Sequence, residues 1–236
     1  PLRTEEEILY PTRFTKWLVG RKTRGVVHLG YQVTPRVVPE NYRSSPYFDF
    51  RNEAGGANGA GLTFLAEIGY EGICRIQFDW DLSAMPQGSR GVSSFAEGSF
   101  VIHAKPEQIK LAFYAVGQIK SITRGDFGFY WFSDPPFDIK ETAEWSMRLF
   151  QALTRFFEDD NKQYRVFVRK DPFEISGGGT ALPRSYLFGY SDAMQPTLLS
   201  LKNMLAHEMI HNWTQLEDEP YGSGTWYTEG LTEYYS

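Results

Sequence analysis

The chain of 236 residues has a single cysteine, Cys74, so it can form neither an intrachain disulfide nor a metal cage of thiolates. It has no excess of basic residues: 24 lysines and arginines stand against 29 aspartates and glutamates, a formal net charge of −5. Because nucleic-acid binding depends on clustered Lys and Arg, we expect no nucleic-acid partner. The sequence also lacks a run of about 18 apolar residues, so we expect no transmembrane segment.

What the chain does contain is typical of a folded protein. Hydrophobic residues make up 42% and charged residues 22% of it, which argues against wholesale disorder. Aromatic residues reach 16%, with 22 Gly and 13 Pro, a mixture that favours loop-rich β-structure over a plain helical bundle. The chain opens at Pro1 without a cationic start and an apolar run. The compartment, the oligomeric state and a signal segment already removed all stay open.

Residues 1–125 are expected to form a β-rich N-terminal domain. Turn residues bound most of its β-branched and aromatic runs, which argues for a β-sandwich or a curved sheet. The predicted strands are Val26–Val33, Pro46–Phe50, Gly61–Ile68, Ile73–Leu82, Ser89–Phe95, Phe100–Ala104 and Ile109–Arg124. We expect Arg51–Gly61, which is rich in glycine and alanine, to be a flexible loop without a phosphate-binding pattern.

The spacing of apolar residues changes in residues 126–236, which are expected to form an α/β domain. Apolar residues at steps of three and four predict a helix over Ile139–Glu158, after Pro135 and Pro136. A second helix is predicted to begin near Pro196, capped by Ser191 or Asp192, and to bury a leucine-rich stripe. Strands are predicted at Tyr164–Arg169 and Tyr186–Tyr190, and a third helix over Thr225–Ser236.

The second helix carries the sequence His207-Glu208-Met209-Ile210-His211. Four residues advance a helix by about one turn, so the two imidazoles project from one face with Cβ atoms roughly 6 Å apart. At that spacing both can reach one tetrahedral Zn²⁺. Glu208 can lean over the metal without binding it and activate a zinc-bound water as general base. The alternative is an exposed helix with two unrelated histidines.

A catalytic zinc needs a third protein ligand beside these two histidines. Glu229 is our candidate, because Gly230 next to it would let its helix approach the neighbouring helix. Glu233, one turn further on, is the second choice. The downstream acidic cluster is interpreted as a solvated turn: Glu217, Asp218 and Glu219.

The segments His207–Trp213 and Trp226–Tyr235 resemble the gluzincin metallopeptidases, and within them the glycyl aminopeptidase-like family (M61), a relative of the M1 aminopeptidases. The resemblance is specific over residues 200–236. It implies zinc held by His207, His211 and Glu229, with Glu208 as the base. It also implies an α+β fold, in which a β-rich N-terminal domain precedes a thermolysin-like zinc-peptidase domain that is truncated within residues 126–236.

The resemblance further implies a peptide or protein substrate. Related aminopeptidases have a Gly-rich edge strand that ends in an acid for the α-amine of the substrate. Gly177, Gly178 and Gly179 match its glycines and predict a backbone open to an extended peptide, although no acid follows them and an ordinary hairpin loop is the alternative. The family's transition-state-stabilising Tyr or His is expected beyond Ser236. A zinc-dependent, aminopeptidase-like hydrolase is therefore predicted, and a catalytically inactive peptide- or partner-binding domain is the second interpretation. A β-type binding module with an incidental motif is the third.

Overall fold

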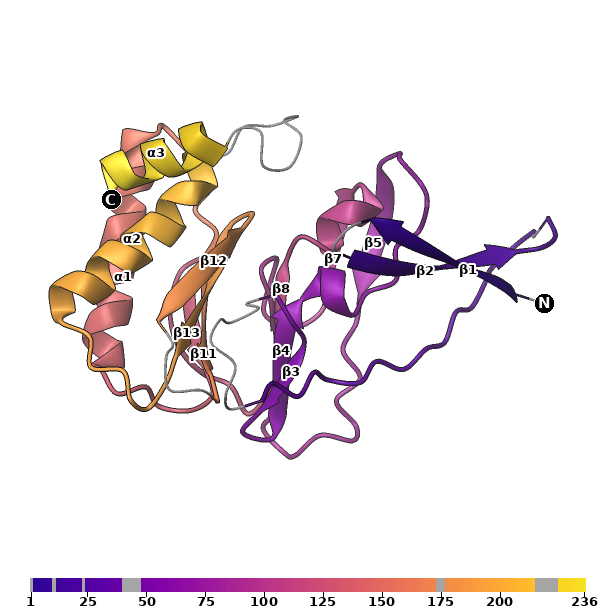
Figure 1. Cartoon of the computed structure of the whole chain (residues 1–236), viewed down its shortest axis with the longest axis horizontal. Coiled ribbons are helices and arrows are strands. Elements are labelled where there is room, and N and C mark those ends of the chain that lie inside the picture. The colour runs from indigo at the N-terminus through magenta and orange to yellow at the C-terminus, as the bar shows by residue number, and fades with distance from the viewer. Residues whose placement is uncertain (1, 10–11, 23, 40–47, 173–176, 215–224) are drawn as a thin grey trace. The chain divides into compact units, whose positions relative to one another are not determined.

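The computed structural model describes residues 2–9, 12–22, 24–39, 48–172, 177–214 and 225–236 (Figure 1). The chain divides into two compact units, Pro1–Thr34 and Pro35–Ser236. The smaller unit contains an antiparallel hairpin of β1 (Leu2–Leu9) and β2 (Thr12–Val19), which the sequence did not predict. The strand predicted at Val26–Val33 is wrong, because these residues have no regular structure.

Two small antiparallel sheets form the N-terminal part of the larger unit. One has the strand order β3-β4-β8-β6 and the other pairs β5 with β7. Their strands are β3 (Arg51–Glu53), β4 (Gly56–Ala60), β5 (Cys74–Phe78), β6 (Arg90–Ser93), β7 (Phe100–Ala104) and β8 (Phe113–Gly117). The strands predicted around β5, β6 and β7 are thus confirmed, and the predicted run Ile109–Arg124 is broken by a turn after Gly117.

Two predictions for this part are wrong. Arg51–Gly61 is not a flexible loop, because β3 and β4 form a hairpin there. Its glycines permit close packing: a Cβ on Gly59 would lie 2.7 Å from the Cα of Phe50. Gly61–Ile68 is not a strand, because a short 3-10 helix occupies Gly61–Thr63. Of the strand predicted at Pro46–Phe50, residues 46 and 47 lie outside the described residues, and 48–50 are not in a strand.

The central element of the larger unit is a five-stranded mixed sheet of order β12-β13-β11-β10-β9. β10, β11 and β13 run parallel, and the two edge strands run antiparallel to their neighbours. The strands are β9 (Lys120–Arg124), β10 (Phe127–Trp131), β11 (Tyr164–Lys170), β12 (Gly178–Leu182) and β13 (Ser185–Tyr190). The predicted strands within β11 and β13 are confirmed, whereas β10 was not predicted.

Three helices follow the predicted segments closely. α1 spans Ile139–Phe156, and Asp138 caps it by accepting a hydrogen bond from the Glu141 amide. α2 spans Leu198–Thr214, and α3 spans Thr225–Tyr235. α2 begins after Thr197, whose Oγ1 accepts from the Ser200 amide, so the predicted caps further upstream are wrong.

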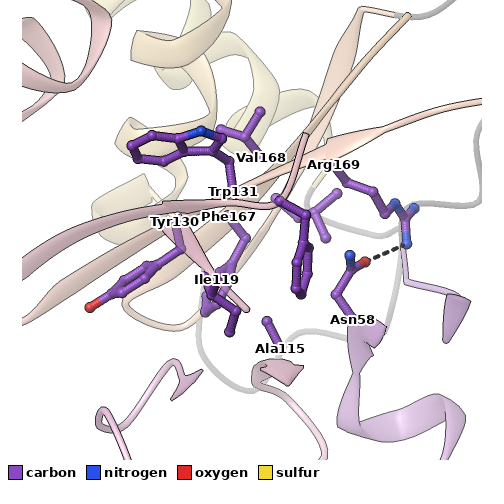
Figure 2. Close-up of a pocket in the computed structure, with 10 residues that line it drawn as sticks. Asn58, Ala115, Ile119, Tyr130, Trp131, Phe167, Val168 and Arg169 are labelled. Atoms are coloured by element: carbon purple, nitrogen blue, oxygen red, sulfur yellow. Dashed lines mark hydrogen bonds between the residues drawn. The ribbon is translucent and has the colours of Figure 1, made fainter. Parts of the chain in front are cut away.

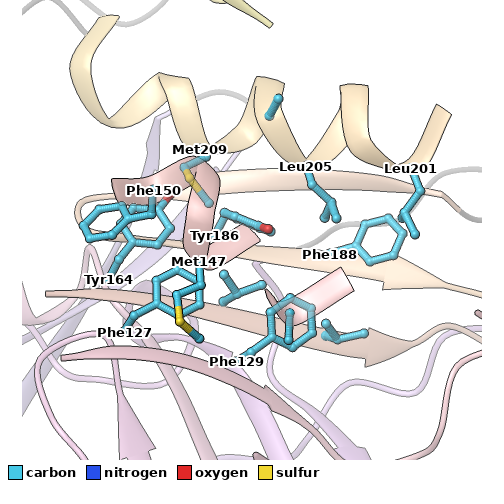
Figure 3. Close-up of a cluster of buried hydrophobic side chains, with 14 of the residues drawn as sticks. Phe127, Phe129, Met147, Phe150, Tyr164, Tyr186, Phe188, Leu201, Leu205 and Met209 are labelled. Carbon is cyan, nitrogen blue, oxygen red and sulfur yellow. The ribbon is translucent and has the colours of Figure 1, made fainter. Parts of the chain in front are cut away.

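The largest core lies between the five-stranded sheet and the two helices α1 and α2 (Figure 3). Alternate residues of the strands point to this side, and α2 supplies Leu201, Leu205 and Met209, all at most 2% exposed. The predicted apolar stripe of α2 is therefore confirmed at these three positions. The stripe holds one side of α2 against the sheet and leaves the opposite side, with its histidines, free of the core.

The other face of the five-stranded sheet packs on the four-stranded sheet. A cavity of about 10 Å³ lies there among Asn58, Ile119, Tyr130 and Phe167, which is room for no more than about one water (Figure 2). This cavity is a packing gap, too small for a substrate, and none of the residues that line it belongs to a helix.

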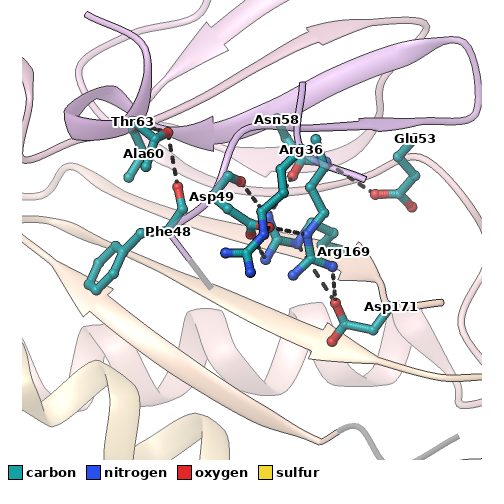
Figure 4. A network of polar contacts seen from close by, with 10 residues as sticks. Arg36, Phe48, Asp49, Glu53, Asn58, Ala60, Thr63, Arg169 and Asp171 are labelled. Atoms are coloured by element: carbon teal, nitrogen blue, oxygen red, sulfur yellow. Dashed lines mark hydrogen bonds and ion pairs between the residues drawn. The ribbon is translucent and has the colours of Figure 1, made fainter. Parts of the chain in front are cut away.

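A buried network of charged side chains joins β3 to the end of β11 (Figure 4). Arg51 donates to Asp49 at 2.6 Å and to Asp171 at 2.8 Å, and Arg169 lies 3.1 Å from Asp49. Because each of these charges is almost wholly buried, removal of one partner would leave another uncompensated. The network therefore fixes how the two sheets meet.

The larger unit is thus a mixed α+β structure, as predicted. The boundary predicted at residue 125 falls between β9 and β10, which pair in one sheet, and the division into 1–125 and 126–236 stays a prediction. No helix among the described residues combines the length and apolarity needed to cross a bilayer.

Candidate metal centre

Two helices bring the predicted metal ligands together. α2 presents His207 and His211 on one face, and α3 presents Glu229 beside them. One ligand atom from each of the three residues lies within 4.8 Å of the other two. The sequence separates Glu229 from His211 by 18 residues, so the helix packing creates this proximity.

The distances between the three donor groups suit a tetrahedral ion. The Nε2 atoms of His207 and His211 are 3.2 Å apart. The Glu229 carboxylate lies 3.2 Å from Nε2 of His207 and 3.6 Å from Nε2 of His211. Ligands about 2.0–2.1 Å from a tetrahedral Zn²⁺ stand about 3.3 Å from one another. The donor set therefore fits zinc in both chemistry and spacing.

Burial and charge also suit a metal centre. The side chain of His211 is 11% exposed, that of His207 25% and that of Glu229 51%, so the trio is open on one side. Burial lowers the pKa of His211, Glu229 opposes this and His207 reinforces it, with a net decrease. A lowered pKa keeps this imidazole neutral near pH 7, the form in which it binds a metal.

Glu208 lies beside the trio and against the edge strand β12. The residue is 9% exposed, and burial, with a smaller contribution from the charge of Glu229, raises its pKa to about 7. A Cβ on Gly179 would lie 2.6 Å from Cγ of Glu208 and 2.8 Å from its Cδ. The side chain of Glu208 thus occupies the space that a side chain at position 179 would need.

The predicted glycines lie at an edge of the five-stranded sheet. Gly178 and Gly179 are the first residues of β12, and Gly177 precedes them with a φ of +135°. On one side β12 pairs with β13, and no strand pairs with its other side among the described residues. The backbone of β12 beside Glu208 is thus an edge to which a further strand could add.

Two expectations about α3 need correction or refinement. Gly230 does not serve a close helix contact, because a Cβ there would have nothing within 4 Å. Glu233 is not among the three converging groups. Its carboxylate lies 3.6 Å from Nδ1 of His207, the ring nitrogen that faces away from the trio, and is 81% exposed. The cluster Glu217, Asp218 and Glu219 lies outside the described residues.

Sequence reasoning missed two buried threonines behind the trio. Thr232 of α3 contacts Nδ1 of His211 at 3.3 Å and Oγ1 of Thr214 at 2.7 Å. Each lies three residues after a predicted ligand, Thr214 after His211 and Thr232 after Glu229. A polar residue at that helical spacing was the signal available in the sequence.

Comparison with known proteins finds a similar fold among solved structures. No family model and no curated protein matches the sequence. Among solved structures, the chain is similar to an aminopeptidase N family protein from Idiomarina loihiensis, with a TM-score of 0.57 and 15% sequence identity. The match covers 81% of this chain and 38% of that protein. At this identity the match shows similarity of fold alone, and both the gluzincin and the M61 assignments stay predictions.

Proposed function

We propose that the protein is a zinc-dependent metallopeptidase that hydrolyses peptide bonds in an aminopeptidase-like manner. His207, His211 and Glu229 would hold the zinc, and Glu208 would act as general base. The observation that carries the proposal is the convergence of three donor groups from α2 and α3, at distances that suit one tetrahedral ion, beside a buried carboxylate.

His207, His211 and Glu229 would hold a zinc ion that would supply positive charge to polarise a water molecule and the scissile carbonyl. Glu208 takes a proton from the attacking water and gives it to the leaving amine, so that it ends the cycle as it began. Its pKa near 7 suits both transfers, because a general base works best when its pKa lies near the operating pH.

The strand β12 would bind the substrate. An extended peptide can pair with the edge of β12 that no described strand occupies, and Gly177, Gly178 and Gly179 leave the backbone open for that pairing. Since Gly179 touches Glu208, a peptide on this edge would pass next to the base. Two features favour a peptidase over a simple zinc site: this edge, and the similarity to an aminopeptidase N family fold.

Replacement of Glu208 by Gln tests the proposal, because the amide keeps the shape of the side chain and loses its basicity. We expect Glu208→Gln to keep stoichiometric zinc by elemental analysis. Its kcat on a panel of unblocked and N-acetylated peptides should fall by about 10²–10⁴-fold. His207→Ala should lose the zinc itself.

Each alternative outcome has a clear meaning. Unchanged hydrolysis in Glu208→Gln would remove Glu208 from the mechanism. Wild-type protein that binds zinc and peptide without cleaving any substrate would identify the catalytically inactive binding domain. Wild-type protein without stoichiometric zinc would overturn the metal centre. A preference for unblocked peptides would support aminopeptidase action.

A further inference from the structure

A chain of hydroxyl groups runs behind His211, on the side away from the three converging donors. Nδ1 of His211 lies 3.3 Å from Oγ1 of Thr232, and Oγ1 of Thr232 lies 2.7 Å from Oγ1 of Thr214. Oγ1 of Thr214 donates to the backbone carbonyl of Ile210 at 3.4 Å. Thr232 is 0% and Thr214 4% exposed, so these groups bond to one another rather than to bulk water.

The carbonyl at the end of this chain sets the direction of its hydrogen bonds. A carbonyl oxygen only accepts, so the Thr214 hydroxyl donates its proton to Ile210. The oxygen of Thr214 is then free to accept the proton of the Thr232 hydroxyl. The oxygen of Thr232 can then accept a proton in turn, and Nδ1 of His211 is placed to donate it in the tautomer that carries its proton on Nδ1.

This direction determines the tautomer of the imidazole. A neutral histidine carries its proton on one ring nitrogen, and the hydrogen bond made by one nitrogen decides which. With the proton on Nδ1, Nε2 has a free lone pair, and Nε2 is the atom that faces His207 and Glu229. The opposite tautomer would place N–H where a metal must bind.

We propose that Thr232 and Thr214 are positioning residues, which hold His211 in the Nδ1–H tautomer so that Nε2 is ready for a metal. The inference rests on the proposed zinc site and adds two residues to it. α3 therefore has two roles, since it supplies a ligand through Glu229 and orients another ligand through Thr232. Groups that orient a metal-bound histidine typically affect metal affinity by about 10–100-fold.

The first test measures the tautomer in the metal-free wild-type protein, by ¹⁵N NMR of histidine-labelled protein near neutral pH. His211→Ala assigns the signals among the four histidines. We expect protonated Nδ1 and unprotonated Nε2 for His211. An Nε2–H tautomer in the wild type would overturn the proposal, and this measurement requires neither zinc nor activity.

The second test uses Thr232→Val, which keeps the shape of the side chain and removes its hydroxyl. We expect the Nε2–H tautomer to become populated and zinc affinity, measured by competition with a chromophoric chelator, to fall about 10–100-fold. Thr232→Ser should restore the Nδ1–H tautomer and the zinc affinity. Thr214→Val should reduce each of these two quantities by less than Thr232→Val does. Thr154→Val is the matched control, since Thr154 is 4% exposed and its hydroxyl bonds to a carbonyl within α1.

The outcomes separate this inference from the proposed function. If the wild type binds zinc, and Thr232→Val keeps both its affinity and its tautomer, the positioning role is wrong while the zinc site stands. If the wild type shows the Nδ1–H tautomer but binds no zinc, the proposed function fails. If Thr232→Val does not fold, Thr214→Val and the wild-type tautomer still decide the question.

Discussion

At the scale of single residues, two glutamates of α3 compete for the role of third ligand. Glu229 lies within 3.2 Å and 3.6 Å of the two metal-facing nitrogens, whereas Glu233 lies 3.6 Å from Nδ1 of His207 and is 81% exposed. Loss of a ligand should cost more than loss of an outer group. We expect Glu229→Ala to lower zinc affinity by more than about 100-fold, and Glu233→Ala by less than about 10-fold.

Competition with a chromophoric chelator measures both variants under one set of conditions. Circular dichroism of each metal-free variant serves as the control for folding of α3. A larger loss of affinity in Glu233→Ala than in Glu229→Ala would reverse the choice between the two residues, and the sequence interpretation with it.

The same residues show what the sequence could and could not reveal. His207, Glu208 and His211 share one helix, so their spacing alone predicts a common face. Glu229 was selected through its neighbour Gly230 and through resemblance, and the first argument fails because a Cβ on Gly230 would meet nothing within 4 Å. The packing of α3 on α2, which the sequence does not reveal, brings Glu229 to the histidines. The Thr214–Thr232 contact depends on that packing too, and threonine in a helix usually has only a local role.

At the scale of elements, β12 and α2 meet at Gly179. A methyl group there would lie 2.6 Å from Cγ of Glu208, so the carboxylate must move. We expect Gly179→Ala to lower kcat/KM for peptides by about 10–100-fold, because a displacement near 1 Å can cost a factor of about 10². Zinc content should not change, since the three heavy atoms nearest to a Cβ at this position all belong to Glu208, which is not one of the proposed ligands.

The neighbouring Thr180 supplies the control for this prediction, because alternate residues of a strand point to opposite faces. Thr180→Ala should leave kcat/KM within about threefold of wild type. Equal activity of Gly179→Ala and wild type, measured with the same peptide and the same zinc content, would show that the position of Glu208 does not depend on β12.

Elements with a strong side-chain pattern were the ones that the sequence predicted well. α1 and α2 have apolar residues at helical spacing. The predicted start of each helix and the predicted end of α1 lie within two residues of those in the structure. β3 and β4 were missed because a glycine- and alanine-rich segment has no such pattern. Gly56 is needed for the close approach of Phe132, and Gly59 for that of Phe50. Neither contact follows from the spacing of residues in the sequence.

At the scale of the whole molecule, Asp159 connects three segments that together place the metal-bearing helix. It follows α1 and accepts hydrogen bonds from Nη1 and Nη2 of Arg184 in the β12–β13 turn. It accepts another from Nε1 of Trp213 in α2. The same turn is held to α2 a second time, because the Arg184 amide donates to Asn212 at 3.0 Å. The stability of this junction should therefore depend on the charge of Asp159.

Asp159 gives a pH dependence with a definite sign. Burial raises its pKa, but the hydrogen bonds from Arg184, Asn161 and Trp213 outweigh burial, and the net pKa is lower than the usual 3.8. A lowered carboxyl pKa stabilises the fold fully above the unfolded-state pKa, and this contribution is lost as pH falls through the folded-state pKa.

We expect Asp159→Asn to lower the free energy of unfolding at pH 7 by on the order of 1 kcal/mol. The difference from wild type should shrink below about pH 4. Urea unfolding at both pH values measures it, with the exposed Asp160→Asn as control. A deficit that persists undiminished at pH 3 would show that Asp159 acts through its shape and not its charge.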